Sequence, residues 1–495
     1  MSFRTLVKGS AIAFAGNALI YALAFVFQLL LVRLLGAGGY GVWGFALTLA
    51  VTVAQFSTLG LGYACVYYSS ERNASAVGLT PVSAARLAVL AALLVSCAAG
   101  AALLPAARFW IVPAYRLPDL GPLLYIFAAA VPLLALAGAM ESAFRSRHDA
   151  AAAFKMKLTA EGLKLLAVPA ALLLFAADAR VAAAALVAAL AVSVVYGARM
   201  LGKLVFPLRT LFKGPVFPAA LPLAAYSLPF FLQEVLMTLR DKADTFIIGY
   251  FSTAEYLGMY KGACVLVALI SFVPNSVSYL LFPLINGLSG GHQRGELADF
   301  GRRTIKLLLY AGVPAVVLLV ILARPLLTLA MGADFAPADK ALALLAVSAG
   351  LGLVHAVYGQ VLAARNRTGR LLLANALAFT LTLALDLALI PVYGITGAGA
   401  ASLAGSVLLT LMIVIPAAVE MGGLVFPPAA SAAVLPAACF AGVGFALRGG
   451  SAAALLGVCA AFCIFWGLWL AVFERAELRR AAAELKTFLA ARLAR

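Results

Sequence analysis

The ionisable residues that could do chemistry gather in one part of an otherwise apolar chain. The sequence places Glu234, Arg240, Asp241, Asp244 and Lys261 in or beside long apolar runs. Charged side chains are costly inside a membrane unless they are paired or hydrated, so they indicate a binding or transport role there. Cations in this setting could hold a phosphate group, and a desolvated carboxylate could carry a proton or bind Na⁺.

Two sets of candidate residues follow from this chemistry. The substrate-binding set contains cationic and amide side chains within or at the margins of apolar runs: Arg240, Lys261, Lys164, Arg33, Asn17, Gln28, Gln55 and Asn275. The ion-coupling set contains carboxylates within such runs: Asp244, Asp241, Glu234 and Asp386. Ion pairs within one helix are the structural alternative. They would join Arg240 with Asp244, Glu161 with Lys164, and Glu141 with Arg145.

The polar positions of this region repeat an earlier pattern. A shift of 217 residues aligns these pairs: Asn17 with Glu234, Gln28 with Thr245, and Gly41 with Gly258. At 100° per residue, Asn17, Tyr21 and Gln28 lie within about 40° of one another on a helix. Glu234, Thr238 and Thr245 share the same spacing. Each copy is therefore predicted to be an apolar helix with one polar stripe.

The composition indicates a membrane protein. Of the 495 residues, 65% are hydrophobic and 11% are charged, and the mean hydropathy is +1.07. These values lie far outside the range of soluble domains. We therefore predict an all-α polytopic membrane protein, since apolar runs of about 20 residues recur along the chain. The net charge of +17 is expected to reflect membrane topology and not nucleic-acid binding.

About fourteen transmembrane helices are predicted from these runs. They cover residues 10–33, 42–65, 85–107, 120–143, 158–177, 181–199, 221–250, 256–285, 304–325, 338–363, 371–391, 396–418, 428–447 and 451–473. Most of the 36 Lys and Arg residues fall in alternate loops. Because cytoplasmic loops are enriched in basic residues, this pattern places both termini in the cytoplasm.

The 217-residue shift brings the first six predicted spans onto the next six. Six is even, so both halves have the same orientation and should be related by an axis along the membrane normal. We predict two parallel six-helix bundles, residues 1–213 and 214–420, that face each other across a central cleft. Two additional helices follow in residues 421–473. Residues 474–495 form either a cytoplasmic amphipathic helix or a frayed end.

Four short segments have a characteristic order and spacing. They are Leu34–Gly41, Asp244–Tyr260, Leu281–Ile285 and Ile390–Ala398. With these segments the chain resembles the polysaccharide (lipid-linked oligosaccharide) flippases of the MOP superfamily, whose relatives include the lipid II flippases and the multidrug and toxin extruders. The likeness extends over essentially the whole chain.

This resemblance implies a flippase of the bacterial plasma membrane. Its substrate would be an undecaprenyl-diphosphate-linked oligosaccharide, moved from the cytoplasmic to the outer leaflet by ion-coupled alternating access for surface or exopolysaccharide biosynthesis. The implied partners are the lipid-linked oligosaccharide, a coupling ion (H⁺ or Na⁺), the lipid bilayer and the polysaccharide polymerase machinery. A lipid II flippase, or a multidrug or metabolite exporter on the same scaffold, is the alternative.

The chemistry of such a substrate supports the same expectation. A diphosphate with its glycan cannot cross hydrocarbon unaided, whereas the polyprenyl tail can remain in lipid. The carrier must therefore offer a hydrated, partly cationic cleft that opens sideways to the bilayer.

Neither an enzymatic activity nor a cofactor is expected. The sequence lacks a Gly-x-x-x-x-Gly-Lys-Ser/Thr run for nucleotide phosphates. The predicted outer loops are too short to hold the donor and acceptor of a membrane glycosyltransferase. The six cysteines lie in or beside apolar runs without metal-ligand spacing, so no metal centre is predicted.

Overall fold

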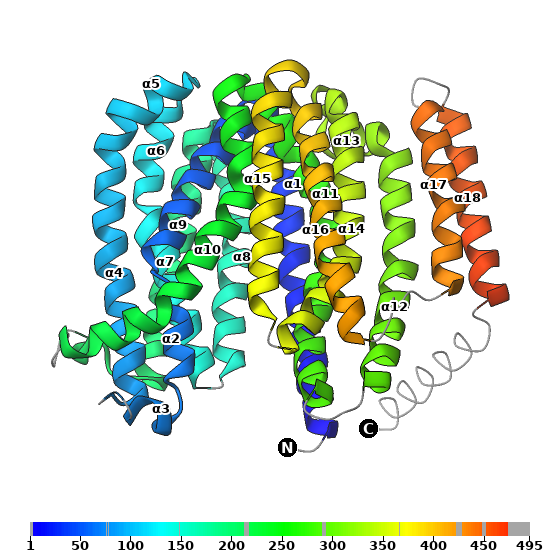
Figure 1. Cartoon of the computed structure of the whole chain (residues 1–495). Coiled ribbons are helices and arrows are strands. Elements are labelled where there is room, and N and C mark those ends of the chain that lie inside the picture. Colours follow the sequence, from blue (N-terminus) through cyan, green and yellow to red (C-terminus); the bar gives the residue numbers. More distant parts are fainter. Residues whose placement is uncertain are drawn as a thin grey trace, which may run out of the picture. The chain divides into compact units, whose positions relative to one another are not determined.

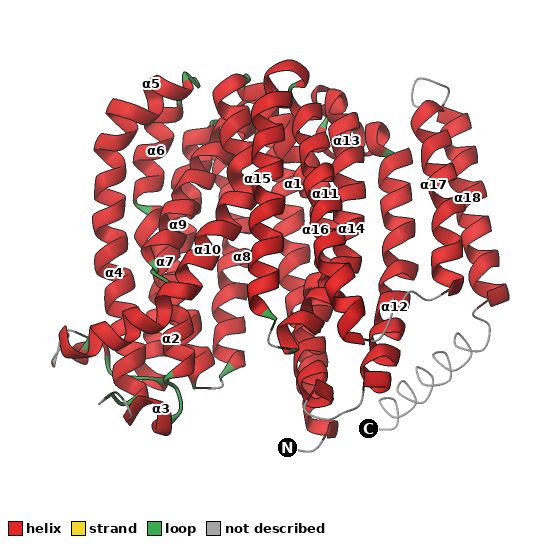
Figure 2. Ribbon diagram, viewed as in Figure 1, coloured by secondary structure: helices red, strands yellow, loops and turns green. Residues whose placement is uncertain are grey.

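The described part of the chain is built from helices and loops, with no strand (Figure 2). The computed structural model describes residues 3–75, 77, 79–147, 149–211, 217–289, 294–365, 367–421, 428–447 and 452–473. Its helices (Figure 1) are α1 (Phe3–Ser57), α2 (Leu61–Tyr67), α3 (Glu71–Ser75), α4 (Pro81–Ala106), α5 (Val112–Tyr115), α6 (Leu120–Ala128), α7 (Ala130–Ser146), α8 (Ala150–Leu174), α9 (Ala179–Leu204), α10 (Phe217–Phe251), α11 (Ala254–Ser289), α12 (Arg294–Ile321), α13 (Ala323–Met331), α14 (Asp339–Ala364), α15 (Thr368–Tyr393), α16 (Ile395–Met421), α17 (Pro428–Ala446) and α18 (Ala452–Phe473). The predicted all-α class is confirmed.

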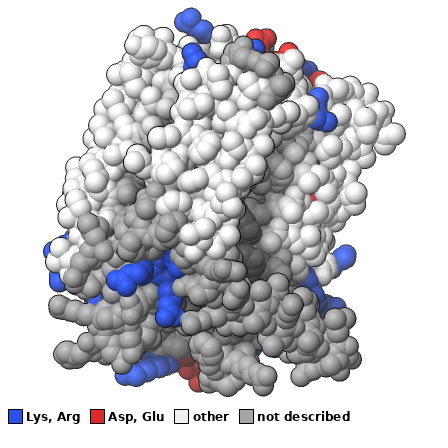
Figure 3. Space-filling view, turned by 90° about the vertical axis from the view of Figure 1, so that its right-hand side faces the viewer, with Lys and Arg blue, Asp and Glu red and all other residues white. Residues whose placement is uncertain are grey.

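The helices have the length and composition of membrane spans. Within the described residues, nine helices could cross a membrane, and the number is ten when the bent pair α6–α7 is one span. The helices α8 and α10, of 25 and 35 residues, are outside this set and carry charged side chains. In Figure 3, a broad area of uncharged side chains lies between groups of Lys and Arg toward the two ends. The chain is a multi-pass membrane protein, and the total of about fourteen spans stays a prediction.

The first two predicted spans, 10–33 and 42–65, form one bent helix. The bend in α1 lies at Gly36, whose φ of 66° and ψ of 178° are not helical. Glycine reaches positive φ without a steric penalty because it has no Cβ. The helix then ends at Ser57, and Gly60, with φ 66°, precedes α2. The predicted end of the second span at residue 65 is therefore wrong, because a left-handed glycine interrupts the apolar run.

The chain falls into two compact units. The first contains Met1–Val265, Leu327–Ala341 and Asn375–Ala401, and the second contains the remaining segments. The first unit thus includes α1 to α10, the start of α11 and most of α15. All residues of the candidate site described below belong to this unit.

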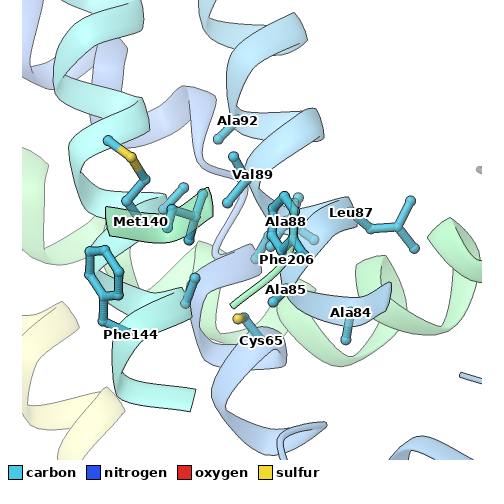
Figure 4. Close-up of a cluster of buried hydrophobic side chains, with 14 of the residues drawn as sticks. Cys65, Ala84, Ala85, Leu87, Ala88, Val89, Ala92, Met140, Phe144 and Phe206 are labelled. Atoms are coloured by element: carbon cyan, nitrogen blue, oxygen red, sulfur yellow. The ribbon is translucent and has the colours of Figure 1, made fainter. Parts of the chain in front are cut away.

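Small side chains dominate the core of the first unit. Figure 4 shows part of it, where Ala85 of α4 lies beside Cys65 of α2, and Met140 and Phe144 of α7 belong to the same cluster on the other side of the view. Lipid is as apolar as these side chains, so burial alone does not drive helices together in a membrane. Small residues instead let the backbones approach closely and gain van der Waals contact.

An aromatic core joins α12, α17 and α18 in the second unit. Phe440 of α17 contacts Phe462 of α18 with ring centroids 5.6 Å apart, and Tyr310 of α12 contacts Trp466 at 6.3 Å. Gly444 allows α17 to pack closely, because a Cβ there would lie 2.4 Å from Ile321. Aromatic pairs at these distances add about 0.5–1.5 kcal/mol beyond their buried area.

Glycines bring α1 and α11 into backbone contact within the first unit. A Cβ at Gly41 would lie 1.9 Å from the carbonyl oxygen of Ala254, and a Cβ at Gly258 would lie 1.9 Å from that of Ala37. No side chain fits at such distances, so glycine is required at both positions. The contacts are reciprocal, since a shift of 217 residues carries Ala37 onto Ala254 and Gly41 onto Gly258.

Candidate substrate and ion site

Lys261 reaches across this glycine contact to α1. Its ammonium group donates a hydrogen bond to the hydroxyl of Thr48, which in turn donates to the carbonyl oxygen of Gly44 at 2.7 Å. Gly44 makes room for the lysine, because a Cβ at that position would lie 3.3 Å from Lys261 Cδ. Lys261 forms no ion pair with the described residues, so this cation is held inside the helical region by hydroxyl contact.

Asp244 of α10 faces α11. One carboxylate oxygen accepts a hydrogen bond from the hydroxyl of Tyr260, and the other accepts from the backbone N–H of Thr245. The carboxylate also lies close enough to Lys261 and Lys242 for their charges to interact. The two hydrogen bonds stabilise the ionised carboxylate, and no salt bridge to it forms among the described residues.

Arg240 connects α10 with α15. Its Nη1 donates to the side-chain oxygen of Asn375 at 2.7 Å, and its Nε lies 3.3 Å from a carboxylate oxygen of Asp241. The alternative predicted from spacing, an ion pair with Asp244, is not formed within the described residues. The Asp241 side chain is 60% exposed, so this ion pair is weak and leaves much of the guanidinium charge available.

Asp386 of α15 is fully buried. Neither of its carboxylate oxygens has a hydrogen-bond partner in the described part of the chain. Its charge interacts with that of Asp244, so α10 and α15 bring two carboxylates near each other. An isolated buried carboxylate is costly, which makes a bound cation or proton the chemically expected complement.

Together these side chains form what we call the polar cluster. Its members come from α1, α10, α11 and α15: Thr48, Arg240, Asp244, Tyr260, Lys261, Asn375 and Asp386. The cluster combines cations that can hold an anionic group with carboxylates that can hold a cation.

Two of the predicted amide positions of α1, Gln28 and Gln55, make hydrogen bonds to other helical residues. Gln55 accepts a hydrogen bond from the Thr238 hydroxyl of α10 at 3.4 Å. Gln28 accepts one from the Tyr40 hydroxyl at 2.9 Å, which joins the two parts of α1 on either side of the Gly36 bend. Gln55 thus lies beside Thr238 of the polar stripe on α10, whereas Gln28 stabilises the bend in α1.

Two predicted cations have structural partners. Lys164 forms an ion pair with Glu161 at 2.5 Å on α8, as the pairing alternative predicted. Arg33 donates hydrogen bonds to the carbonyl oxygens of Leu329 and Ala330 at the end of α13. The carbonyls that end a helix lack partners within that helix, so Arg33 acts there as a cap.

The remaining candidates take no part in these contacts. Glu234 and Asn17 are half-buried on α10 and α1, and neither forms a hydrogen bond or ion pair with the residues the structure describes. Asn275 lies outside the residues whose side chains are described.

Sequence reasoning did not identify Tyr260 as a partner of Asp244. The signal was available, because α10 and α11 are joined by a turn at Ser252 and the two residues lie equally far from it along the chain. Antiparallel helices joined by a short turn bring such positions level with each other.

Within the described residues, no group of three or more His, Cys, Asp or Glu side chains is arranged to hold a metal ion. The helical membrane fold and the buried mixture of cations and carboxylates define a class: membrane carriers with a charged site inside the helical region.

Sequence comparison gives the family. A family model described as polysaccharide biosynthesis protein matches residues 30–340, so the chain belongs to this family. It is 26% identical over 193 residues to a protein of Haloferax volcanii described as "Probable low-salt glycan biosynthesis flippase Agl15". That alignment covers 39% of this chain and 41% of the relative, less than half of each.

Solved structures show the same fold. The lipid II flippase MurJ in an inward closed conformation aligns with a TM-score of 0.75 at 13% identity, and the alignment covers 94% of this chain and all of MurJ. An inward-facing multidrug resistance MATE transporter of the MOP superfamily aligns with a TM-score of 0.66 at 13% identity, covering 81% and 94%. The predicted resemblance is confirmed at the level of the family and of the fold, which is that of MurJ and of the MATE transporter of the MOP superfamily.

Proposed function

We propose that this protein is a flippase that moves a lipid-linked oligosaccharide across the membrane for polysaccharide biosynthesis. The substrate would be an undecaprenyl-diphosphate-linked oligosaccharide, moved from the cytoplasmic to the outer leaflet. One observation carries the proposal: Arg240 and Lys261 lie inside the helical region of a polysaccharide biosynthesis protein. Their hydrogen-bond partners Asn375 and Thr48 are neutral, and the ion pair of Arg240 with Asp241 is weak.

The cations suit a diphosphate. The Arg240 guanidinium presents a fork of N–H donors that matches phosphate oxygens, and its contacts with the neutral Asn375 and the exposed Asp241 compensate its charge only weakly. Lys261 adds a compact ammonium group whose hydrogen bond to Thr48 can be exchanged for one to phosphate. A sugar diphosphate could thus replace hydration with charge-assisted hydrogen bonds along its path.

Ion coupling is assigned to the carboxylates. Asp386 and Asp244 lie near each other on α15 and α10, and Asp386 has no protein partner in the described residues. H⁺ or Na⁺ bound between them would offset their repulsion, and release of that ion would favour another helix arrangement. Asp241 and Glu234 are secondary candidates on the same helix.

The proposal includes two parallel six-helix bundles, residues 1–213 and 214–420, with a central cleft, two further helices in 421–473, and about fourteen spans in all. The reciprocal contacts of Gly41 and Gly258 support it, because a two-fold axis along the membrane normal would generate such a pair. We place both termini in the cytoplasm on the distribution of basic residues, and the bacterial plasma membrane is what the family resemblance implies.

Transport by purified protein in liposomes tests the proposal. Undecaprenyl-diphosphate oligosaccharide with a fluorescent glycan is placed in both leaflets, and its outward movement is measured by quenching from outside. The Arg240→Ala/Lys261→Ala variant should move it about 10- to 100-fold more slowly, since a hydrogen bond to a charged group contributes about 1.5–3 kcal/mol.

Arg180→Ala is the matched control, because Arg180 pairs with Asp119 on the exposed surface. The control should transport at the native rate. Native transport by the double variant would remove both cations from the mechanism, and transport of a cationic drug in place of the glycan would favour the exporter alternative.

A further inference from the structure

A basic pocket lies between the first turns of α8 and the last turns of α9, outside the polar cluster. Its volume is about 380 Å³, and its lining includes Lys155 of α8 and Lys203, Met200 and Leu204 of α9. This volume falls within the range of about 300–1,000 Å³ that small ligands occupy.

The two lysines of this pocket have no carboxylate partner within ion-pair distance in the described residues. Asp149 also lines the pocket, but its carboxylate accepts a hydrogen bond from the N–H of Ala152 at 2.9 Å and so caps α8. The other lysines of α8 are paired, Lys157 with Glu141 at 2.8 Å and Lys164 with Glu161. Lys155 is thus the one lysine of α8 that forms no ion pair with the described residues, and with Lys203 of α9 it gives the pocket two cations against the single carboxylate of Asp149.

The remaining lining suits a lipid. Met200 is apolar, and Leu204 is 42% exposed at the rim. An acyl chain can lie against such side chains while its phosphate meets the lysines. The N-terminal end of α8 adds the partial positive charge of the helix dipole at the same place.

We propose that this pocket binds the phosphate head group of an anionic membrane phospholipid. Basic pockets between transmembrane helices on the cytoplasmic side bind anionic head groups, and the predicted topology places this end of α8 and α9 in the cytoplasm. The pocket is a separate site, because it shares no residue with the polar cluster.

Lipid retention by the full chain tests this site. The protein is reconstituted in nanodiscs of phosphatidylcholine and phosphatidylglycerol, and the lipids that remain bound after detergent extraction are counted by native mass spectrometry. The native chain should retain phosphatidylglycerol preferentially. In Lys155→Gln/Lys203→Gln this preference should fall by about fivefold per lysine, since each basic residue near an anionic surface contributes about that factor.

Lys157→Gln is the matched control, because Lys157 lies on the same helix but is paired with Glu141 outside the pocket. It should retain phosphatidylglycerol as the native chain does. An unchanged preference in the double variant, or an equal loss in the control, would overturn the proposal. A second set of nanodiscs also contains undecaprenyl diphosphate. A preference for this lipid over phosphatidylglycerol that depends on Lys155 and Lys203 would also overturn the proposal, because the pocket would then be a substrate site.

Discussion

At the scale of single residues, Asp386 stands apart from the other charged groups. Asp244 has Tyr260 and a backbone N–H as donors, and Arg240 has Asn375, whereas both oxygens of Asp386 lack a partner in the described residues. A buried charge without a partner is maintained only when function compensates its cost. Asp386 is therefore the residue at which ion binding is most directly tested.

Asp386→Asn should remove ion-dependent stabilisation. The native chain in detergent should unfold at a higher temperature as Na⁺ rises at constant ionic strength, or as pH falls, because a ligand of the folded state stabilises it by RT ln(1 + [L]/Kd). The asparagine variant should not respond, since it carries no charge to be neutralised. Its own unfolding temperature without Na⁺ should equal or exceed the native value.

The control for this measurement is Asp334→Asn, which changes an exposed carboxylate before α14. It should keep the native response. If Asp386→Asn also kept it, the coupling ion would bind elsewhere in the chain.

The sequence predicted part of this site and not its partners. It identified Arg240, Lys261, Asp244 and Asp386 because charge within an apolar run is visible without a structure. Their contacts depend on helix rotation and on which helices are neighbours. Arg240 bonds to Asn375 and not to Asp244. Arg240 and Asn375 are 135 positions apart in the sequence, so helical spacing alone cannot predict their contact.

At the scale of helices, the crossing of α1 and α11 is constrained by close backbone contact. Gly41 and Gly258 each lie against a carbonyl oxygen of the facing helix, and Lys261 extends from α11 one turn beyond this contact. The position of the cation thus depends on two residues without side chains.

Gly258→Ala should destabilise the chain by about 1–3 kcal/mol or more, because the added Cβ would overlap the carbonyl of Ala37 and force the helices apart. The measurement is the thermal midpoint in detergent. Gly162→Ala on α8 is the control, since a Cβ there meets nothing within 4 Å. It should be neutral or slightly stabilising, because alanine favours helix. Equal midpoints for both variants would contradict the close approach.

Helix boundaries were predicted well where charge or proline ends an apolar run, and poorly where glycine bends one. The predicted span 371–391 corresponds to α15, Thr368–Tyr393, and differs from it by three residues at the start and two at the end. The apolar pattern predicted a loop between the spans 10–33 and 42–65. In the structure α1 is helical on both sides of Gly36 and only changes direction there. Hydropathy reports burial in lipid and carries no information on φ.

At the scale of the whole molecule, composition was sufficient to predict a helical membrane protein, while orientation depends on the unequal distribution of Lys and Arg. That distribution places Arg147, after α7, in the cytoplasm and Arg116, after α5, outside. Both side chains are exposed, so each can be replaced by a reactive cysteine. The direction of transport and the location of the basic pocket both depend on this orientation.

Cysteine labelling should therefore give opposite results at the two positions. In a chain whose six native cysteines are replaced by serine, a membrane-impermeant maleimide applied to intact cells should label Arg116→Cys. It should label Arg147→Cys only after the membrane is permeabilised, because positive charge is retained on the cytoplasmic side. The reverse pattern would place Lys155 and Lys203 at the outer surface, and the substrate would then enter the carrier from the opposite leaflet to the one proposed.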